Sequence, residues 1–126
     1  MVRLDELARL DESGVMAVEG APGQSFLHTI DDSRRIIEAC YEHNVGAALL
    51  YAENMPEGFF DLSSRQAGEI LQKLRNYRIR LAIVCSRDSP IVFSSRFGEM
   101  VSEEQKGRDF GIFDTRESAL EWLRME

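Results

Sequence analysis

The sequence predicts an α/β layered domain, in which an N-terminal hairpin is followed by alternating helices and mainly parallel strands. Short, continuously apolar runs at residues 47–51 and 81–85 are typical of strands that are covered on both faces. Amphipathic segments alternate with these runs, which indicates helices that connect parallel strands through right-handed crossovers. Turn residues between two strand-like segments near the N-terminus predict the opening hairpin.

The composition limits the class of protein. The 126 residues, 44% of them hydrophobic, suffice for one domain over residues 1–126 with its own core. Fifteen basic and 22 acidic residues give a formal net charge of −7, which opposes binding to nucleic acid or to an anionic membrane. Cys40 and Cys85 lie in apolar segments, as reduced thiols do, and acidic residues near the N-terminus argue against a signal peptide. We therefore expect a cytoplasmic protein without a membrane span.

The first third of the chain is expected to form a hairpin and a helix. Residues 4–10 can begin a strand or a helical turn, residues 11–14 have turn chemistry, and residues 15–18 have the pattern of a strand. Residues 29–32 offer helix caps with acids in the first turn, and Asn44 can end the helix in a left-handed conformation. Between them lies an apolar helical stripe formed by Ile36, Ile37, Cys40 and Tyr41.

The middle of the chain predicts a central strand, a loop and a second helix. Residues 47–51 form the strand, and residues 53–61 form a loop from which Phe59 and Phe60 fold back onto the core. The helix is expected to begin at Ser63 or Ser64. Its buried face follows helical spacing and consists of Ala67, Ile70, Leu71 and Leu74.

The last third predicts two further strand and helix pairs. A covered strand at residues 81–85 is followed by a helix that Ser94 or Ser95 can cap and that Gly107 ends. Phe97, Met100 and Val101 are its expected core residues. The final strand spans residues 110–113, and residues 114–117 resemble a capping box before a last helix. That helix is expected to bury Ala119, Leu120 and Leu123, with Trp122 at the edge of the core.

Candidate functional residues concentrate at the loops that follow the strands, where open α/β sheets bind ligands and partners. Ser63 and Gln66 fit a capping box, which is a structural role that needs no further function. A sharper alternative is phosphorylation of Ser63 or Ser64, because a helix N-terminus tolerates a phosphate. Glu53 and Asp61 flank the same loop and are either an acid-base pair or, as abundant surface acids usually are, solvated carboxylates.

Other polar residues favour structural readings. His28 and His43 lack a ligand-like partner at short spacing, so no metal and no cofactor is predicted. The basic residues near the end of the second helix could recognise an acidic partner, but they also complement the helix dipole; they are Lys73, Arg75, Arg78 and Arg80.

Several segments resemble an uncharacterised bacterial family, DUF4180. The resemblance runs through residues 47–50, 60–64, 67–71 and 77–84, and it resumes at residues 106–108, 113–115 and 119–123. It therefore covers nearly the whole chain. The family brings no known activity with it.

The order of strand, Asp-Ser loop, helix and strand is also similar to that of STAS domains, the sulfate transporter and anti-sigma-factor antagonist class. In the antagonists, a partner kinase phosphorylates a serine at a helix start, and its state decides binding. The resemblance places the aspartate at Asp61 and the phosphoserine at Ser63 or, second, Ser64. The chain departs from the motif at Leu62 and Arg65.

Two classes of function follow. The first is a non-enzymatic cytosolic regulatory or protein-binding module whose contact residues are Glu53, Asp61, Ser63, Ser64 and Arg65. The alternative is a small-molecule-binding protein or modest enzyme that uses strand-end carboxylates together with residues 86–88. Modules of this size often pair, so a homodimer is a further expectation.

Overall fold

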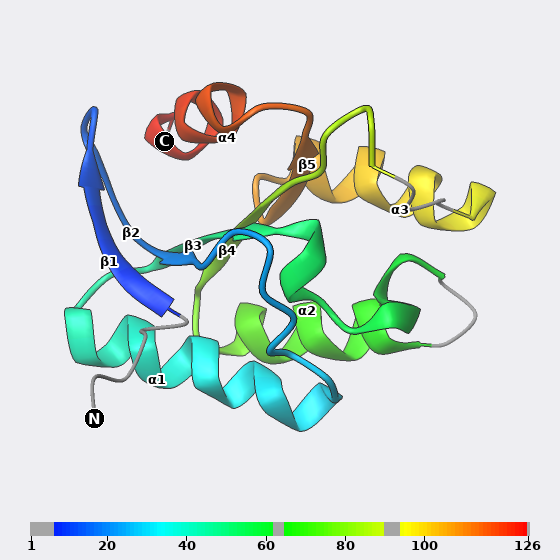
Figure 1. Ribbon diagram of the computed structural model, residues 1–126, viewed down its shortest axis with the longest axis horizontal. Coiled ribbons are helices and arrows are strands. Elements are labelled where there is room, and N and C mark those ends of the chain that lie inside the picture. Colours follow the sequence, from blue (N-terminus) through cyan, green and yellow to red (C-terminus); the bar gives the residue numbers. More distant parts are fainter. Residues whose placement is uncertain (1–6, 62–64, 90–93, 126) are drawn as a thin grey trace.

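The computed structural model describes residues 7–61, 65–89 and 94–125, and it confirms the α/β layered class (Figure 1). One five-stranded sheet carries the strands in the order in which they occur along the chain. Only the first pair is antiparallel, and the other three pairs are parallel. The strands are β1 (Leu7–Glu12), β2 (Val15–Gly20), β3 (Ala47–Tyr51), β4 (Arg80–Val84) and β5 (Phe110–Phe113).

The opening hairpin has a tighter turn than the sequence predicted. Residues 4–10 were predicted to begin either a strand or a helical turn, and from Leu7 onward they form a strand. β1 continues to Glu12, which pairs with Val15. Only Ser13 and Gly14 remain in the turn, with φ values of 55° and 81°. Two successive positive φ values define the turn whose twist matches that of a hairpin.

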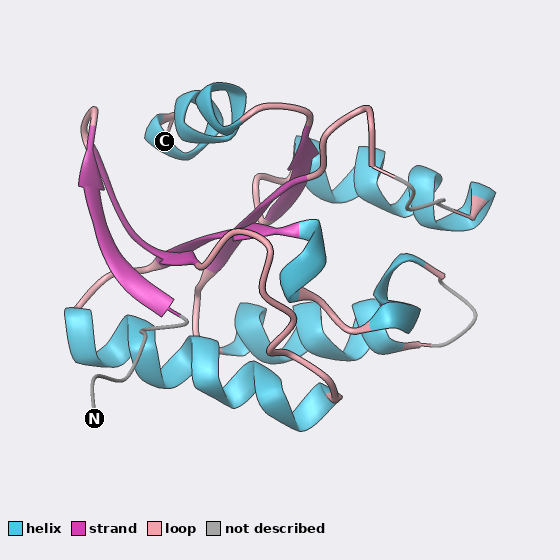
Figure 2. Ribbon diagram, viewed as in Figure 1, coloured by secondary structure: helices cyan, strands magenta, loops and turns pink. Residues whose placement is uncertain are grey.

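Three helices cover one face of the sheet and the fourth covers the other, as Figures 1 and 2 show for α1, α2 and α4. Right-handed crossovers that step in one direction across a sheet place their helices on the same face, which accounts for the first three. The fourth follows the last strand and returns over the opposite face. The helices are α1 (Ser33–His43), α2 (Gln66–Asn76), α3 (Ser95–Lys106) and α4 (Arg116–Arg124).

Each face of the sheet has its own hydrophobic core. In the first core, the Phe59 ring meets the rings of Phe60, Phe97 and Phe110 edge to face, at centroid distances of 5.2, 5.8 and 6.0 Å. The prediction that Phe59 and Phe60 fold back onto the core is therefore confirmed. In the second core, α4 packs on the other face of the same strands. Its buried residues are Ala119, Leu120, Trp122 and Leu123.

The helix ends agree in part with their predicted signals. Asn44 ends α1 in the left-handed conformation (φ 56°, ψ 50°), as expected. Ser94 is the N-cap of α3, and its Oγ accepts a hydrogen bond from the Phe97 N–H at 3.2 Å. Thr115 caps α4 by accepting from the Ser118 N–H at 3.1 Å, one residue later than the capping box predicted from residues 114–117.

Two predictions about helices were wrong. Tyr41 is 89% exposed, because Ile36 and Cys40 centre the buried stripe of α1 and Tyr41 lies beyond its edge. α2 begins at Gln66, not at Ser63 or Ser64, and its N-cap position is held by Arg65 with φ 66°. Ser63 and Ser64 themselves lie outside the described residues.

Candidate functional site

The segment between β3 and α2 alternates exposed and buried residues at the carboxyl edge of the sheet. It contains two short 3-10 helices, η2 (Ala52–Asn54) and η3 (Glu57–Phe60). Glu53 and Glu57 are exposed, whereas Asn54 and the two phenylalanines are buried. The buried residues therefore fix the backbone from which the acidic side chains reach solvent.

Asn54 is the main polar anchor of this segment. Its side chain is fully buried, and its Oδ1 accepts a hydrogen bond from the Tyr51 N–H at 2.8 Å. Its Nδ2 donates to the carbonyls of Ala21 and Gln24, both at 2.7 Å, and its own carbonyl accepts from the Leu27 N–H. One asparagine thus ties the loop after β2 to the loop after β3.

Gly20 makes room for this anchor. A Cβ atom on Gly20 would lie 2.2 Å from the Asn54 Oδ1, which is far closer than non-bonded atoms approach. The requirement is one of space, since the Asn54 side chain occupies the position that a side chain at residue 20 would need. Gly20, the last residue of β2, is therefore part of the site.

The predicted contact residues that are described all reach solvent. Glu53 lies in η2, Asp61 follows η3, and Arg65 precedes α2, and each is exposed. The Asp61 N–H donates to the Gly58 carbonyl at 3.2 Å, and the Arg65 carbonyl accepts from the Glu69 N–H at 3.1 Å. The other two, Ser63 and Ser64, fall in the part of the chain that is not described.

The loop after β4 adjoins Glu53. Burial is the main cause of the raised pKa of the Cys85 thiol, a hydrogen bond with Ser89 lowers that pKa, and the charge of Glu53 raises it further. A neutral thiol is a poor nucleophile, so Cys85 is not activated. Arg87 in this loop pairs with Asp114 after β5, with the Nε and Oδ2 atoms 2.8 Å apart.

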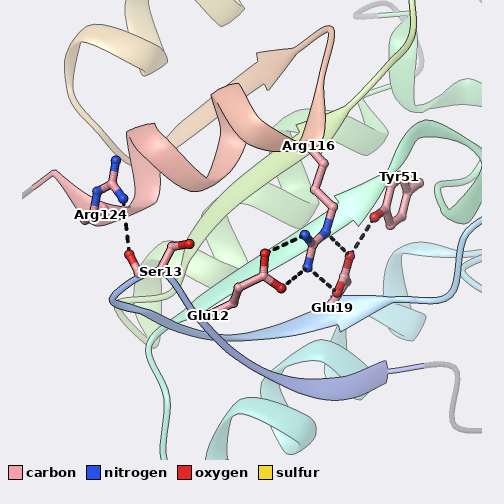
Figure 3. Close-up of polar contacts among 6 residues, drawn as sticks. All are labelled: Glu12, Ser13, Glu19, Tyr51, Arg116 and Arg124. Carbon is pink, nitrogen blue, oxygen red and sulfur yellow. Dashed lines mark hydrogen bonds and ion pairs between the residues drawn. The ribbon is translucent and has the colours of Figure 1, made fainter.

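Sequence reasoning missed a second polar cluster, which joins the first three strands to α4 (Figure 3). The Arg116 guanidinium donates two hydrogen bonds to the Glu12 carboxylate, at 2.9 and 3.1 Å, and two to the Glu19 carboxylate, at 2.9 and 3.2 Å. The Tyr51 hydroxyl donates to the Glu19 Oε2 at 2.6 Å. Two signals were present in the sequence: an acid inside strand β2 and a cation in the first turn of a helix, where the dipole disfavours it.

The ionisation states in this cluster favour a structural role. Burial, followed by the hydrogen bond to Glu19, raises the pKa of Tyr51 to about 12, so the phenol stays protonated. The hydrogen bond and the charge of Arg116 lower the pKa of Glu12, and the two carboxylates raise the pKa of Arg116. One guanidinium therefore pairs with two carboxylates and leaves the cluster with one net negative charge, and these bonds hold α4 on the hairpin. The carboxylates are engaged and are poor candidates for a general base.

The described residues line surface cavities but hold no cluster of metal ligands. One cavity lies between residues 29–31 and residues 69–73 of α2, another between the ends of α1 and α2, and another between the ends of α3 and α4; Glu53, Asp61 and Arg65 do not line these three. Within residues 7–61, 65–89 and 94–125, no group of three or more His, Cys, Asp or Glu residues could hold a metal ion. In the same ranges, no helix combines the length and the apolar character needed to cross a bilayer.

Comparison with known proteins identifies a family without a described activity. No curated protein and no solved structure matches the chain. Residues 12–123, which run from the end of β1 into α4, match the family described as a domain of unknown function, DUF4180. This match confirms the resemblance found in the apolar runs and helix starts of the sequence. The chain therefore belongs to the DUF4180 family.

Proposed function

We propose that this protein is a non-enzymatic regulatory module that binds another protein through the β3–α2 segment, defined here as residues 52–65. The observation that carries the proposal is the contrast within this segment. Glu53, Asp61 and Arg65 are exposed, while Asn54 and the Phe59 and Phe60 pair are buried. A partner that binds side chains on a fixed backbone loses less conformational entropy than one that must order a mobile loop.

The proposal includes a STAS-like form and a phosphorylation switch. Its support is the succession of an opening hairpin, β-α units and an Asp-Leu-Ser-Ser segment between β3 and α2. Ser63 and Ser64 come three and two residues before Gln66, the first residue of α2. A phosphate next to a helix N-terminus meets unpaired backbone N–H groups and the positive end of the helix dipole. Phosphorylation would then change the charge of the contact surface and leave the cores in place.

The alternative, a small-molecule site or modest enzyme built on strand-end carboxylates, has less support. Such a site requires Glu53 and Asp61 to converge on a concave pocket. Both side chains are exposed, Glu53 in η2 and Asp61 after η3. The carboxylates that do converge are Glu12 and Glu19, and Arg116 holds both of them.

The test compares the proteins retained by wild-type and variant chains from extracts of the native cell. Two double variants alter the contact residues. The first combines Glu53→Lys with Arg65→Glu, and the second, the aspartate variant, combines Ser63→Asp with Ser64→Asp. Intact-mass analysis of the native chain shows whether it carries phosphate. We expect one partner to be retained by the wild type and to be depleted at least about tenfold by the first variant. The aspartate variant should change the amount of the same partner that is retained, because aspartate mimics the negative charge of a phosphate.

A matched control exchanges two charges elsewhere. Arg34 and Glu38 are exposed on α1, so Arg34→Glu with Glu38→Lys leaves the net charge unchanged, as the first contact variant does, without touching the β3–α2 segment. The control should retain the partner at the wild-type level. An identical set of retained proteins for the wild type and both contact variants would reject this surface. A partner that is retained regardless of the serine substitutions would reject the switch.

A further inference from the structure

β1 is the outer strand of the sheet, as the strand order and Figure 2 show. Within the described ranges, β2 is the only strand that pairs with it. An outer strand presents backbone N–H and C=O groups along its free edge, where another strand can add. The edge formed by residues 7–12 is therefore a surface on which a further strand can pair.

The hairpin register determines which backbone groups face outward. Because the turn has two residues, Glu12 and Val15 form the hydrogen-bonding pair that closes the hairpin. Pairing groups alternate along an antiparallel strand, so the groups of Leu10 and Ala8 also point toward β2. Those of Arg9 and Asp11 point to the free edge. Any strand that adds to this edge pairs with these two residues.

The side chains of Arg9 and Asp11 carry opposite charges on the same face of β1. They are 51% and 65% exposed, and the Arg9 Nη2 lies 4.0 Å from the Asp11 Oδ2. The third charged residue of the strand, Glu12, faces the other side of the sheet and is engaged by Arg116. The charges available to a second strand on this edge are thus one cation and one anion, two residues apart.

We propose that two copies of this chain pair through their β1 edges, in antiparallel orientation about a two-fold axis at Leu10. In this register Arg9 lies opposite the partner's Asp11, and Asp11 lies opposite the partner's Arg9. Both are outward-pointing residues, so their backbone groups also form the hydrogen-bonded pair of the new ladder. The proposal does not depend on the β3–α2 segment or on the function proposed for it.

Other antiparallel registers set like charges against each other. An axis at Arg9 places Arg9 opposite the partner's Arg9, and an axis at Asp11 places two aspartates opposite each other. Charges on an edge strand usually prevent pairing, but opposite signs at this spacing select one register instead. Met16 adds apolar surface beside the charged pair, since it is opposite Asp11 in the hairpin and 51% exposed.

The pairing would join two five-stranded sheets into one continuous sheet. Leu10, which is buried in the second core, would face the partner's Leu10 at the axis, on the α4 side of the sheet. The interface thus combines a backbone ladder, two symmetric ion pairs and an apolar contact. A C2 arrangement is the usual form of a homodimer, because one surface serves both copies.

Sedimentation equilibrium of the full chain and of charge-reversal variants tests the proposal. The wild type should be a dimer. Arg9→Asp places two aspartates opposite each other at both symmetric positions, and Asp11→Arg places two arginines there, so each single variant should dimerise about tenfold or more weakly. The double variant R9D/D11R restores opposite charges in the same register. Its dimerisation should return to near the wild-type level.

Arg34→Asp is the matched control, because it makes the same charge change on the exposed face of α1, where Arg34 pairs with Glu38. It should dimerise like the wild type, and circular dichroism should show all variants folded. A monomeric wild type would overturn the proposal. So would single variants that dimerise as tightly as the wild type, which would indicate another interface, or a double variant that stays as weak as the single ones.

Discussion

Asn54 holds the carboxyl edge of the sheet together at the level of a single residue. It is a polar side chain with no exposed surface, and both its oxygen and its nitrogen are hydrogen-bonded to backbone. A fully satisfied buried amide contributes to stability, whereas its loss leaves the partner groups without bonds in a place that water does not reach. The position of Glu53 beside it depends on these bonds.

We predict that Asn54→Ala lowers the free energy of unfolding by about 2–4 kcal/mol, because the Tyr51 N–H and the carbonyls of Ala21 and Gln24 lose their partner. Urea denaturation measures the change. Asn76→Ala is the control, since Asn76 is exposed and accepts one hydrogen bond from Gln72. It should cost less than about 0.5 kcal/mol. Equal effects of the two substitutions would contradict the anchoring role of Asn54.

α4 is held on the sheet by polar contacts at both of its ends. Arg116 in the first turn binds Glu12 and Glu19, and the Arg124 Nη1 near the last turn donates to the Ser13 carbonyl at 3.3 Å (Figure 3). A cation at a helix N-terminus opposes the helix dipole, so the two carboxylates are needed to compensate for it. The element therefore depends on the hairpin for its electrostatics as well as for its packing.

The ion pair between Arg116 and Glu12 makes the stability of the folded chain depend on pH. Arg116 lowers the pKa of Glu12 below its ordinary value of 4.5, so the ionised carboxylate is favoured in the folded chain. The resulting stabilisation is fully present above pH 4.5 and is lost as the pH falls through the lowered pKa of the folded state. We predict that Glu12→Gln makes the unfolding free energy fall less steeply over this acidic range. Denaturant midpoints measured across the range provide the slopes.

Glu121→Gln gives the comparison for this experiment, because it removes an exposed carboxylate from the outer face of the same helix. Its pH profile should follow that of the wild type. A Glu12→Gln profile that also coincides with the wild type would show that the ion pair with Arg116 does not stabilise the folded state.

The two cores of the molecule share one sheet. β2, β3 and β4 each contribute alternate side chains to both faces: Val18, Leu50 and Ile83 reach the first core, and Ala17, Leu49 and Ala82 reach the second. Alternation with a period of two makes this division unavoidable in a sheet that is covered on both sides. Neither core can unfold without exposing the other face of the same strands.

We therefore predict that both faces unfold in a single transition. Trp122 is the only tryptophan and belongs to the second core, so its fluorescence reports on the α4 face. Far-ultraviolet circular dichroism is dominated by the other three helices, which cover the opposite face. The two signals should give coincident urea midpoints. Loss of fluorescence at a lower urea concentration than loss of circular dichroism would show that α4 detaches first.

Local patterns were enough to predict most of the elements. The strand at residues 47–51 and the buried face of α2 follow from apolar spacing, and the left-handed end of α1 at Asn44 follows from local backbone chemistry. At the start of α3 the sequence offered Ser94 or Ser95 as the cap, and the structure has Ser94 there. The start of α2 was misplaced because the serines offered a familiar capping signal, whereas the helix begins after Arg65.

Strand and helix patterns depend on neighbours a few residues apart, so the amino-acid order alone settled the layered α/β class and most of its elements. The polar clusters depend on contacts between distant segments: Arg116 and Glu12 are 104 residues apart, and Asn54 meets Ala21 across 33 residues. Such contacts arise only when strand order and crossover hand bring the segments together. Tertiary structure therefore decided that these side chains form a clamp and an anchor, and that β1 is the outer strand of the sheet among the described residues.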